Sequence, residues 1–192
     1  ILVSRPDLGD REAEAVARVV RSQWVGMGPV TAEFELRLQQ QLATAHVVAT
    51  ANGTAALHLA LAALDRDDRT EVILPSLTFA ATVQAVLMAG YRPVFAEVDP
   101  ATLTLSPVDV AHCLNPNTRA LLPVHFAGLT CDLLALGKLA DLHGLALIED
   151  AAHAFGSRRL PAAPPQVTHA ACFSFSANKN ITCGEGGAVA TN

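Results

Sequence analysis

Apolar runs as long as a β-strand alternate with segments of helical periodicity along most of this chain. The runs cover residues 47–49, 71–74, 93–98, 120–124 and 145–148, and the helical segments cover residues 54–64, 79–89 and 132–143. Strands that are apolar throughout and joined by helices are typical of a parallel sheet with helices on both faces. The alternation therefore predicts an α/β fold with a mainly parallel sheet.

Two further helices are predicted ahead of the first strand. Val16, Val19, Val20 and Trp24 recur at helical spacing, and a second helical pattern runs through residues 34–42 beyond the turn at residues 26–29. Such spacing places the apolar side chains of each segment on one face. We expect two amphipathic helices.

The later helices carry signals of burial and of their ends. Residues 54–64 are apolar nearly all round, so we expect this helix to be deeply buried. Asp132 is a residue type that caps helix starts, and Gly144 is typical of helix ends. The helix between them connects two of the predicted strands.

The composition is that of one ordinary globular domain. Of the 192 residues, 51% are hydrophobic and 16% are charged, with a formal net charge of -5. The basic residues are scattered, so we expect no nucleic-acid partner. No apolar stretch approaches the roughly 20 residues of a membrane-spanning helix, and the first six residues lack the layout of a secretory signal. We expect a cytoplasmic protein without a membrane partner.

The four cysteines, Cys113, Cys131, Cys172 and Cys183, include no C-x-x-C pair and no histidine at metal-ligand spacing. This pattern favours free thiols and gives no sign of a metal site. Cys183 follows Lys179 by four residues, so it lies either near a ligand of that lysine or in a tight turn as a small packing residue.

Lys179 lies in a turn between a hydroxyl-bearing apolar run and a glycine-rich stretch, and Asp150 ends the apolar run 145–148 one βα unit upstream. A placed lysine amine forms a Schiff base with an aldehyde, and a buried carboxylate can pair with a protonated pyridine nitrogen. Together they indicate a site for pyridoxal phosphate (PLP). A helix cap or an ion pair with an arginine would also explain Asp150.

A short strand is followed by Asn52, Gly53 and Thr54 at the start of a helix. The backbone amides and positive end of such a helix can bind a phosphate. A capped helix start without any ligand explains the same residues. His153 follows Asp150 by three residues, close enough to share a pocket with it.

These segments resemble the N-terminal part of the DegT-type nucleotide-sugar aminotransferases, which are PLP enzymes of the aspartate aminotransferase fold. The resemblance spans nearly the whole chain in family order, and within the family the lysine segment is most similar to the branch that aminates UDP-4-keto-pentose. Its matching segments are residues 22–25 with Gly28 and Pro29, 52–60, 75–82, 123–125, 149–153 and 173–187.

The resemblance implies a role for each matching site residue. Lys179 would be the Schiff-base lysine and proton shuttle, and Asp150 would be the partner of the pyridine nitrogen. Aminotransferases rather than the related dehydratases are implied, because the dehydratases carry histidine in place of this lysine. The cofactor-binding set would be Gly53, Thr54 and Ser174 around the phosphate, Phe79 stacked on the ring and His153 lining it, with Asp150 and Lys179.

The resemblance also implies the reaction and the architecture. Glutamate would give its amino group to PLP, which would pass it to a keto sugar nucleotide. Residues 1–192 would form a three-layer αβα PLP-binding large domain of fold-type I, incomplete because family members continue through the rest of that domain into a small C-terminal domain. A homodimer, or association with a chain that supplies the missing half, would complete the site.

Two alternatives compete with this interpretation. The chain could be a truncated, non-catalytic remnant of such an enzyme that acts as a binding or interaction module. It could also be an unrelated nucleotide-binding α/β domain, although the sequence has neither a G-x-G-x-x-G after its first strand nor a Walker lysine. The proline-rich stretch at residues 157–166 replaces a glycine-containing hairpin of the family, and its stiffness should alter that surface.

Overall fold

The computed structural model describes residues 5–65, 67–157 and 168–192, and these form a seven-stranded sheet with the order β1-β7-β6-β5-β4-β2-β3. Strands β2 to β6 pair in parallel, whereas β7 runs antiparallel to both of its neighbours. The predicted mainly parallel α/β fold is therefore confirmed. The strands are β1 His46–Thr50, β2 Glu71–Pro75, β3 Arg92–Ala96, β4 Thr118–Leu121, β5 Ala146–Asp150, β6 Ala170–Ser174 and β7 Gly187–Thr191.

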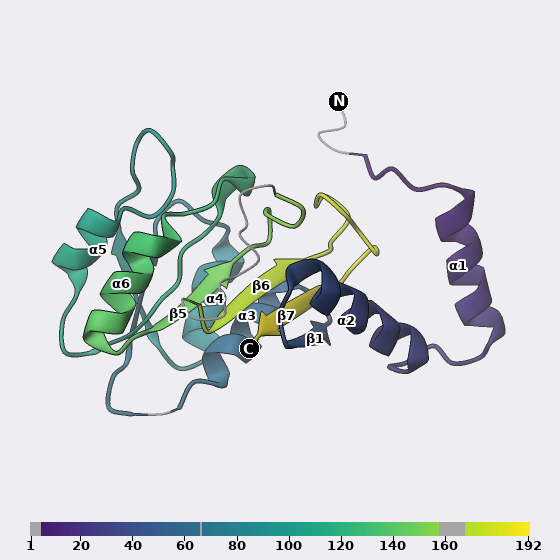
Figure 1. Cartoon of the computed structure of the whole chain (residues 1–192), viewed down its shortest axis with the longest axis horizontal. Helices are drawn as coiled ribbons and strands as arrows, with labels where there is room; N and C mark the ends of the chain where they lie inside the picture. The colour runs from purple at the N-terminus through teal and green to yellow at the C-terminus, as the bar shows by residue number, and fades with distance from the viewer. Residues whose placement is uncertain (1–4, 66, 158–167) are drawn as a thin grey trace.

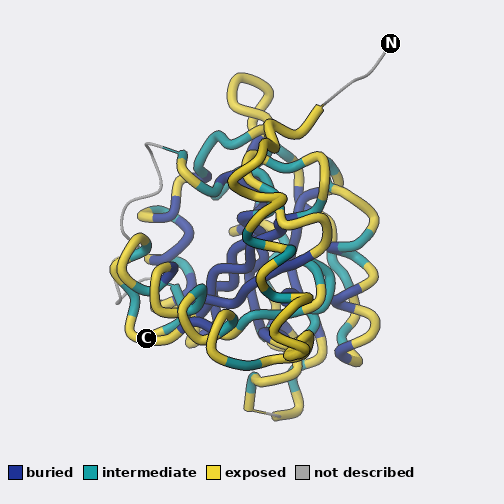
Figure 2. Tube along the Cα trace, turned by 90° about the vertical axis from the view of Figure 1, so that its right-hand side faces the viewer, coloured by how far each residue is buried: buried dark blue, intermediate teal, exposed yellow. Residues whose placement is uncertain are grey.

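Helices cover both faces of the sheet (Figure 1). The helices are α1 Asp10–Arg21, α2 Pro29–Leu42, α3 Gly53–Ala62, α4 Ala80–Met88, α5 Pro107–Cys113 and α6 Leu133–His143. Alternate strand residues face opposite layers. Val72 and Leu74 pack with α3 and α4, whereas Ile73 packs with α5 and α6. Figure 2 shows the buried trace gathered in the middle layer between exposed outer segments.

Helix α3 corrects one prediction. Ala56, Leu57, Ala60 and Leu61 are buried against the sheet and α4, but Leu59 on the outer side is 44% exposed. The segment was expected to be deeply buried because it is apolar all round. A helix in an outer layer buries only the face toward the sheet, and no described element covers its other face.

The helix ends agree with the sequence signals. Asp132 caps α6 by accepting a hydrogen bond from the Ala135 N–H at 3.0 Å, and Gly144 ends the helix with a left-handed conformation. Helix α2 lies where the periodicity predicts it, whereas α1 ends at Arg21 and leaves out Trp24, which the periodic set included. Helix α1 also contains no buried residue and lies away from the sheet in Figure 1.

Some elements were not predicted, among them α5 and β6. Helix α5 is only seven residues long, and β6 lies in the run before the lysine segment that was interpreted by its chemistry alone. A short helix contributes too few positions for a periodic pattern, so α5 is recognisable mainly by its cap, Ser106, which accepts a hydrogen bond from the Asp109 N–H.

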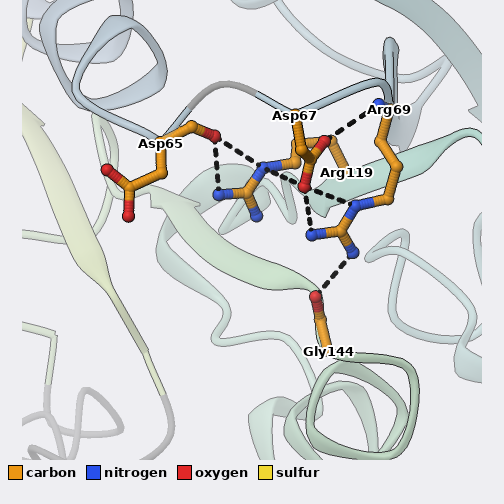
Figure 3. A network of polar contacts seen from close by, with 5 residues as sticks. All are labelled: Asp65, Asp67, Arg69, Arg119 and Gly144. Carbon is orange, nitrogen blue, oxygen red and sulfur yellow. Dashed lines mark hydrogen bonds and ion pairs between the residues drawn. The ribbon is translucent and has the colours of Figure 1, made fainter.

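A polar network ties together the opposite end of the sheet, where the strands begin (Figure 3). Arg69 donates to the Asp67 carboxylate at 2.6 and 2.8 Å and to the Gly144 carbonyl at 2.7 Å. Arg119 in β4 donates to the Asp65 carbonyl at 3.1 and 3.2 Å. These bonds join the segments that enter β2, β4 and β5, so they hold together the end of the sheet where these strands begin.

Several predictions concern features other than the sheet. The four cysteines are free thiols, as predicted. No helix within the described ranges is long and apolar enough to cross a membrane. The prediction about the proline-rich stretch falls on residues 158–167, outside the described residues apart from Ser157.

Candidate active site

A cavity of about 520 Å³ opens beyond the carboxyl ends of the parallel strands, where ligands bind in open α/β sheets. Its size lies within the range of about 300–1,000 Å³ that is usual for small-molecule sites. All of the residues that the sequence singled out as a site line this one cavity: Gly53, Thr54, Phe79, Asp150, His153, Ser174 and Lys179.

The first side of the cavity is the start of α3. Asn52 caps the helix by accepting a hydrogen bond from the Ala55 N–H at 2.9 Å, and its carbonyl accepts from the Ala56 N–H. The earlier N–H groups of Gly53 and Thr54 have no acceptor within the helix. They leave donors and a positive helix end at the cavity, which is the chemistry that binds phosphate.

Glycines allow this corner to close. A Cβ atom on Gly53 would lie 2.8 Å from the Cβ of Ser174, so the glycine lets α3 approach the end of β6. A Cβ atom on Gly187 would collide with the Asn52 carbonyl. The Ser174 hydroxyl therefore reaches the same corner as the free amides of α3.

Asp150 ends β5 and is only 5% exposed. Its Oδ2 accepts a hydrogen bond from the Thr82 hydroxyl at 2.8 Å, and its Oδ1 accepts from the Ala152 N–H at 3.1 Å. Within the described part of the chain no arginine forms an ion pair with it. The alternative of an arginine partner therefore gains no support, and this buried carboxylate still has acceptor sites for a cation in the cavity.

Lys179 and His153 share the field of Asp150. Burial lowers the pKa of Lys179, and the Asp150 charge opposes that effect. Burial also lowers the pKa of His153, the Lys179 charge lowers it further, and Asp150 again opposes the change. A lysine with a lowered pKa has a larger share of its amine in the neutral, nucleophilic form.

Phe79 is the residue before α4 and is 75% exposed. Phe79 is therefore not a core residue. An aromatic ring that is both exposed and at the rim of the cavity is free to stack on a flat ligand.

Other residues at the cavity were missed by the sequence analysis. Thr78 and Thr82 are four residues apart within residues 75–82, which is a helical spacing. The sequence did not show that they lie beside the end of β5. The missed residues with polar side chains are Thr78, Thr82, Ser176, Asn178 and Glu185.

His125 does not line the cavity and is a buried, hydrogen-bonded residue. Its side chain is fully buried, Nδ1 accepts from the Cys131 N–H at 3.2 Å, and Nε2 lies 2.6 Å from the Glu149 carboxylate. Cys183 lies outside the cavity, in a separate groove, and is exposed. In the described residues no cluster of histidine, cysteine or carboxylates has the arrangement of a metal site.

The donor set fits PLP. Free amides with a nearby hydroxyl suit a phosphate, a buried carboxylate suits a protonated ring nitrogen, and a half-buried lysine suits an aldehyde. These groups come from the start of α3, the ends of β5 and β6, and the turn after β6, and they surround one cavity. Nothing in this set requires a metal.

The sequence matches the DegT/DnrJ/EryC1/StrS aminotransferase family over residues 6–192. This match excludes the alternative of an unrelated nucleotide-binding domain.

Three solved structures share the fold over this whole chain or nearly all of it. An aminotransferase from Psychrobacter cryohalolentis is 36% identical with a TM-score of 0.94, over 100% of this chain and 49% of its own. DesI, solved with its TDP-sugar product, is 43% identical with a TM-score of 0.87, over 100% and 49%. NtdA from Bacillus subtilis, solved with pyridoxamine phosphate, is 31% identical with a TM-score of 0.88, over 96% and 42%. The chain thus spans about half the length of these proteins.

Proposed function

Because the chain belongs to the DegT/DnrJ/EryC1/StrS aminotransferase family, whose members use PLP, we propose that it is the cofactor-binding part of a PLP-dependent sugar aminotransferase. The observation that carries the proposal is the convergence of Lys179, Asp150 and the start of α3 on one cavity. Each residue taken alone can be explained without a ligand, but such explanations do not account for the position of all of them around one cavity.

Each group of residues has a defined task in this proposal. The amides of Gly53 and Thr54 and the Ser174 hydroxyl hold the phosphate, and Asp150 keeps the ring nitrogen protonated. Phe79 and His153 line the ring. When bound, PLP supplies an aldehyde that takes up amines and a ring that accepts electrons from the adjacent carbon.

Lys179 performs the proton transfers. Its amine, with a pKa lowered by burial, would accept the α-proton of the amino donor and hold it for the return transfer. In the second half-reaction it moves a proton in the reverse sense on the sugar. Asp150 takes no part in the proton transfers. Its negative charge stabilises the protonated ring nitrogen.

The substrates are proposed to be glutamate and a keto sugar nucleotide. The TDP-sugar product of DesI supports a nucleotide sugar, and the lysine segment supports a 4-keto-pentose among the sugars. An amino sugar made this way would serve a surface polysaccharide, lipid A or a glycosylated metabolite. The proposal has three remaining parts. Residues 1–192 form an incomplete large domain, the protein is a homodimer, and its location is cytoplasmic.

The chain offers a sharp test because its only lysines are Lys179 and Lys138. Lys138 is exposed on α6, away from the cavity. We expect that incubation with PLP, reduction with borohydride and mass spectrometry will find one stoichiometric adduct at Lys179. We also expect Lys179→Ala to abolish turnover of glutamate with a keto sugar nucleotide, while Lys138→Ala changes neither result.

Each outcome of this experiment separates two interpretations. Equal labelling of the two lysines, or labelling of Lys138 alone, would contradict a built cofactor site. An adduct at Lys179 without any transamination, even with added full-length family members as partner chains, would favour the non-catalytic remnant that binds the cofactor.

A further inference from the structure

A chain of hydroxyl groups leads from the cavity to the Asp150 carboxylate. The Thr78 and Thr82 hydroxyl oxygens are 2.6 Å apart, and the Thr82 hydroxyl lies 2.8 Å from Asp150 Oδ2. Thr82 is fully buried, whereas Thr78 is partly buried, and both line the cavity. The chain therefore connects α4 and the segment before it with the end of β5.

The direction of these hydrogen bonds follows from proton counting. An ionised carboxylate only accepts, so the single Thr82 proton is donated to Asp150. The Thr82 oxygen then accepts the Thr78 proton. Each bond polarises the next, and the bond to the charged carboxylate is the stronger of the two.

The carboxylate is held by two different elements. Thr82 on α4 fixes Oδ2, and the Ala152 N–H after β5 fixes Oδ1 at 3.1 Å. A carboxylate held by only one of these bonds could still rotate. Two bonds, one to each oxygen, restrict its rotation, and each oxygen keeps one acceptor site.

We propose that Thr82, supported by Thr78, is a positioning residue that holds the Asp150 carboxylate for the ring nitrogen of the bound cofactor. This inference rests on the proposed function, since Thr82 acts only through Asp150 and that nitrogen. It assigns to a buried threonine a share of the cofactor affinity that ordinary core packing would not explain.

The test uses two variants and two probes. Thr82→Val keeps the shape but removes the donor, and Thr82→Ser keeps the donor but removes the methyl group. The probes are PLP and its 1-deaza analogue, in which a C–H group replaces the ring nitrogen. The dissociation constant of each probe is measured by fluorescence titration with the purified 192-residue chain, without any substrate.

We expect Thr82→Val to weaken PLP binding about tenfold, since a hydrogen bond to a charged group is lost. Thr82→Ser should retain the wild-type affinity. The 1-deaza analogue should bind the wild-type chain and both variants equally, because it offers Asp150 no partner to be positioned for. The difference between the two probes isolates the coupling through the nitrogen.

Thr104 supplies a matched control. It is buried and shares a hydroxyl pair with Thr102 at 2.9 Å, but neither residue lines the cavity. Thr104→Val should leave the affinity for both probes unchanged. Thermal unfolding midpoints of all variants then separate a loss of affinity from a loss of folding.

Failure of the inference is distinguishable from failure of the proposed function. A wild-type chain that does not bind PLP contradicts the proposed function, and this inference falls with it. If the wild-type chain binds PLP, three results overturn the inference alone: unchanged affinity in Thr82→Val, equal losses in the Ser and Val variants, or the same loss for the analogue as for PLP.

Discussion

At the scale of single residues, the charge of Asp150 acts on the pKa of both Lys179 and His153, and the charge of Lys179 acts on the pKa of His153. Burial and the lysine charge lower the pKa of the histidine, and the carboxylate opposes them. Removal of the lysine therefore removes one cause of the lowering. The sign of the resulting change is fixed by the geometry of the pocket.

We predict that Lys179→Ala raises the pKa of His153 toward the usual histidine value of about 6.5. The imidazolium form gains stability because a neighbouring like charge disappears. An NMR titration of the histidine ring protons in the cofactor-free chain measures the change. Lys138→Ala is the control and should leave the titration of His153 as it is, while an unchanged His153 pKa in Lys179→Ala would show that the lysine charge does not reach the ring.

Residue identity alone pointed to only part of this site. Lys179 and Asp150 were recognisable because an aldehyde needs an amine and a ring nitrogen needs a carboxylate. Thr82 was not, since its partner Asp150 lies 68 positions away along the chain. A hydroxyl in a helix has many uses, and only the fold selects one.

At the scale of elements, a single residue sets each end of α6. Asp132 satisfies the Ala135 N–H at the start of α6, and Gly144 adopts the left-handed conformation at its end. The buried face of α6, with Leu136 and Ala140, packs against β4 and β5 of the sheet. A change at the cap should therefore affect stability without touching the pocket.

We predict that Asp132→Ala destabilises the folded chain by about 1 kcal/mol, the usual cost of losing a helix cap. Urea unfolding followed by circular dichroism measures this free energy. Asp141→Ala is the matched control, because this aspartate lies on the same helix in the last turn, where a negative charge opposes the helix dipole. If both variants lose the same stability, the cap has no special role.

At the scale of the whole molecule, the buried core lies in the sheet and the helices packed on it (Figure 2), and α1 stands apart (Figure 1). None of its residues is buried, and Val16 and Val20 are 65% and 61% exposed. A helix of 12 residues without packing is marginal in water. The first helix thus adds little to the stability of the isolated chain.

We predict that trypsin cuts at Arg11, Arg18 and Arg21 before it cuts at Arg92 or Arg119 in the sheet. Local opening of α1 costs little free energy, whereas opening of the strands requires the core to unfold. Mass spectrometry of the products at early times gives the order. Equal protection of α1 would mean that its apolar face is covered in solution, and sedimentation would then show whether a second copy covers it.

The sequence by itself determined the class of fold and the ends of α6, and it indicated the residues of the candidate site. These depend on local signals: the alternation of apolar runs, the caps at Asp132 and Gly144, and side chains whose reactivity is intrinsic, such as Lys179. Segments that carry several such signals in family order also indicated PLP before any contact was seen.

Only the tertiary structure decided which of these residues meet. The antiparallel direction of β7, the exposed outer face of α3 and the bond from Thr82 to Asp150 depend on segments far apart along the chain. Periodicity states which face of an element is apolar, but not which element will cover it. Burial and pairing are set by the packing of the sheet against its helices, so they arise only when the whole chain has folded.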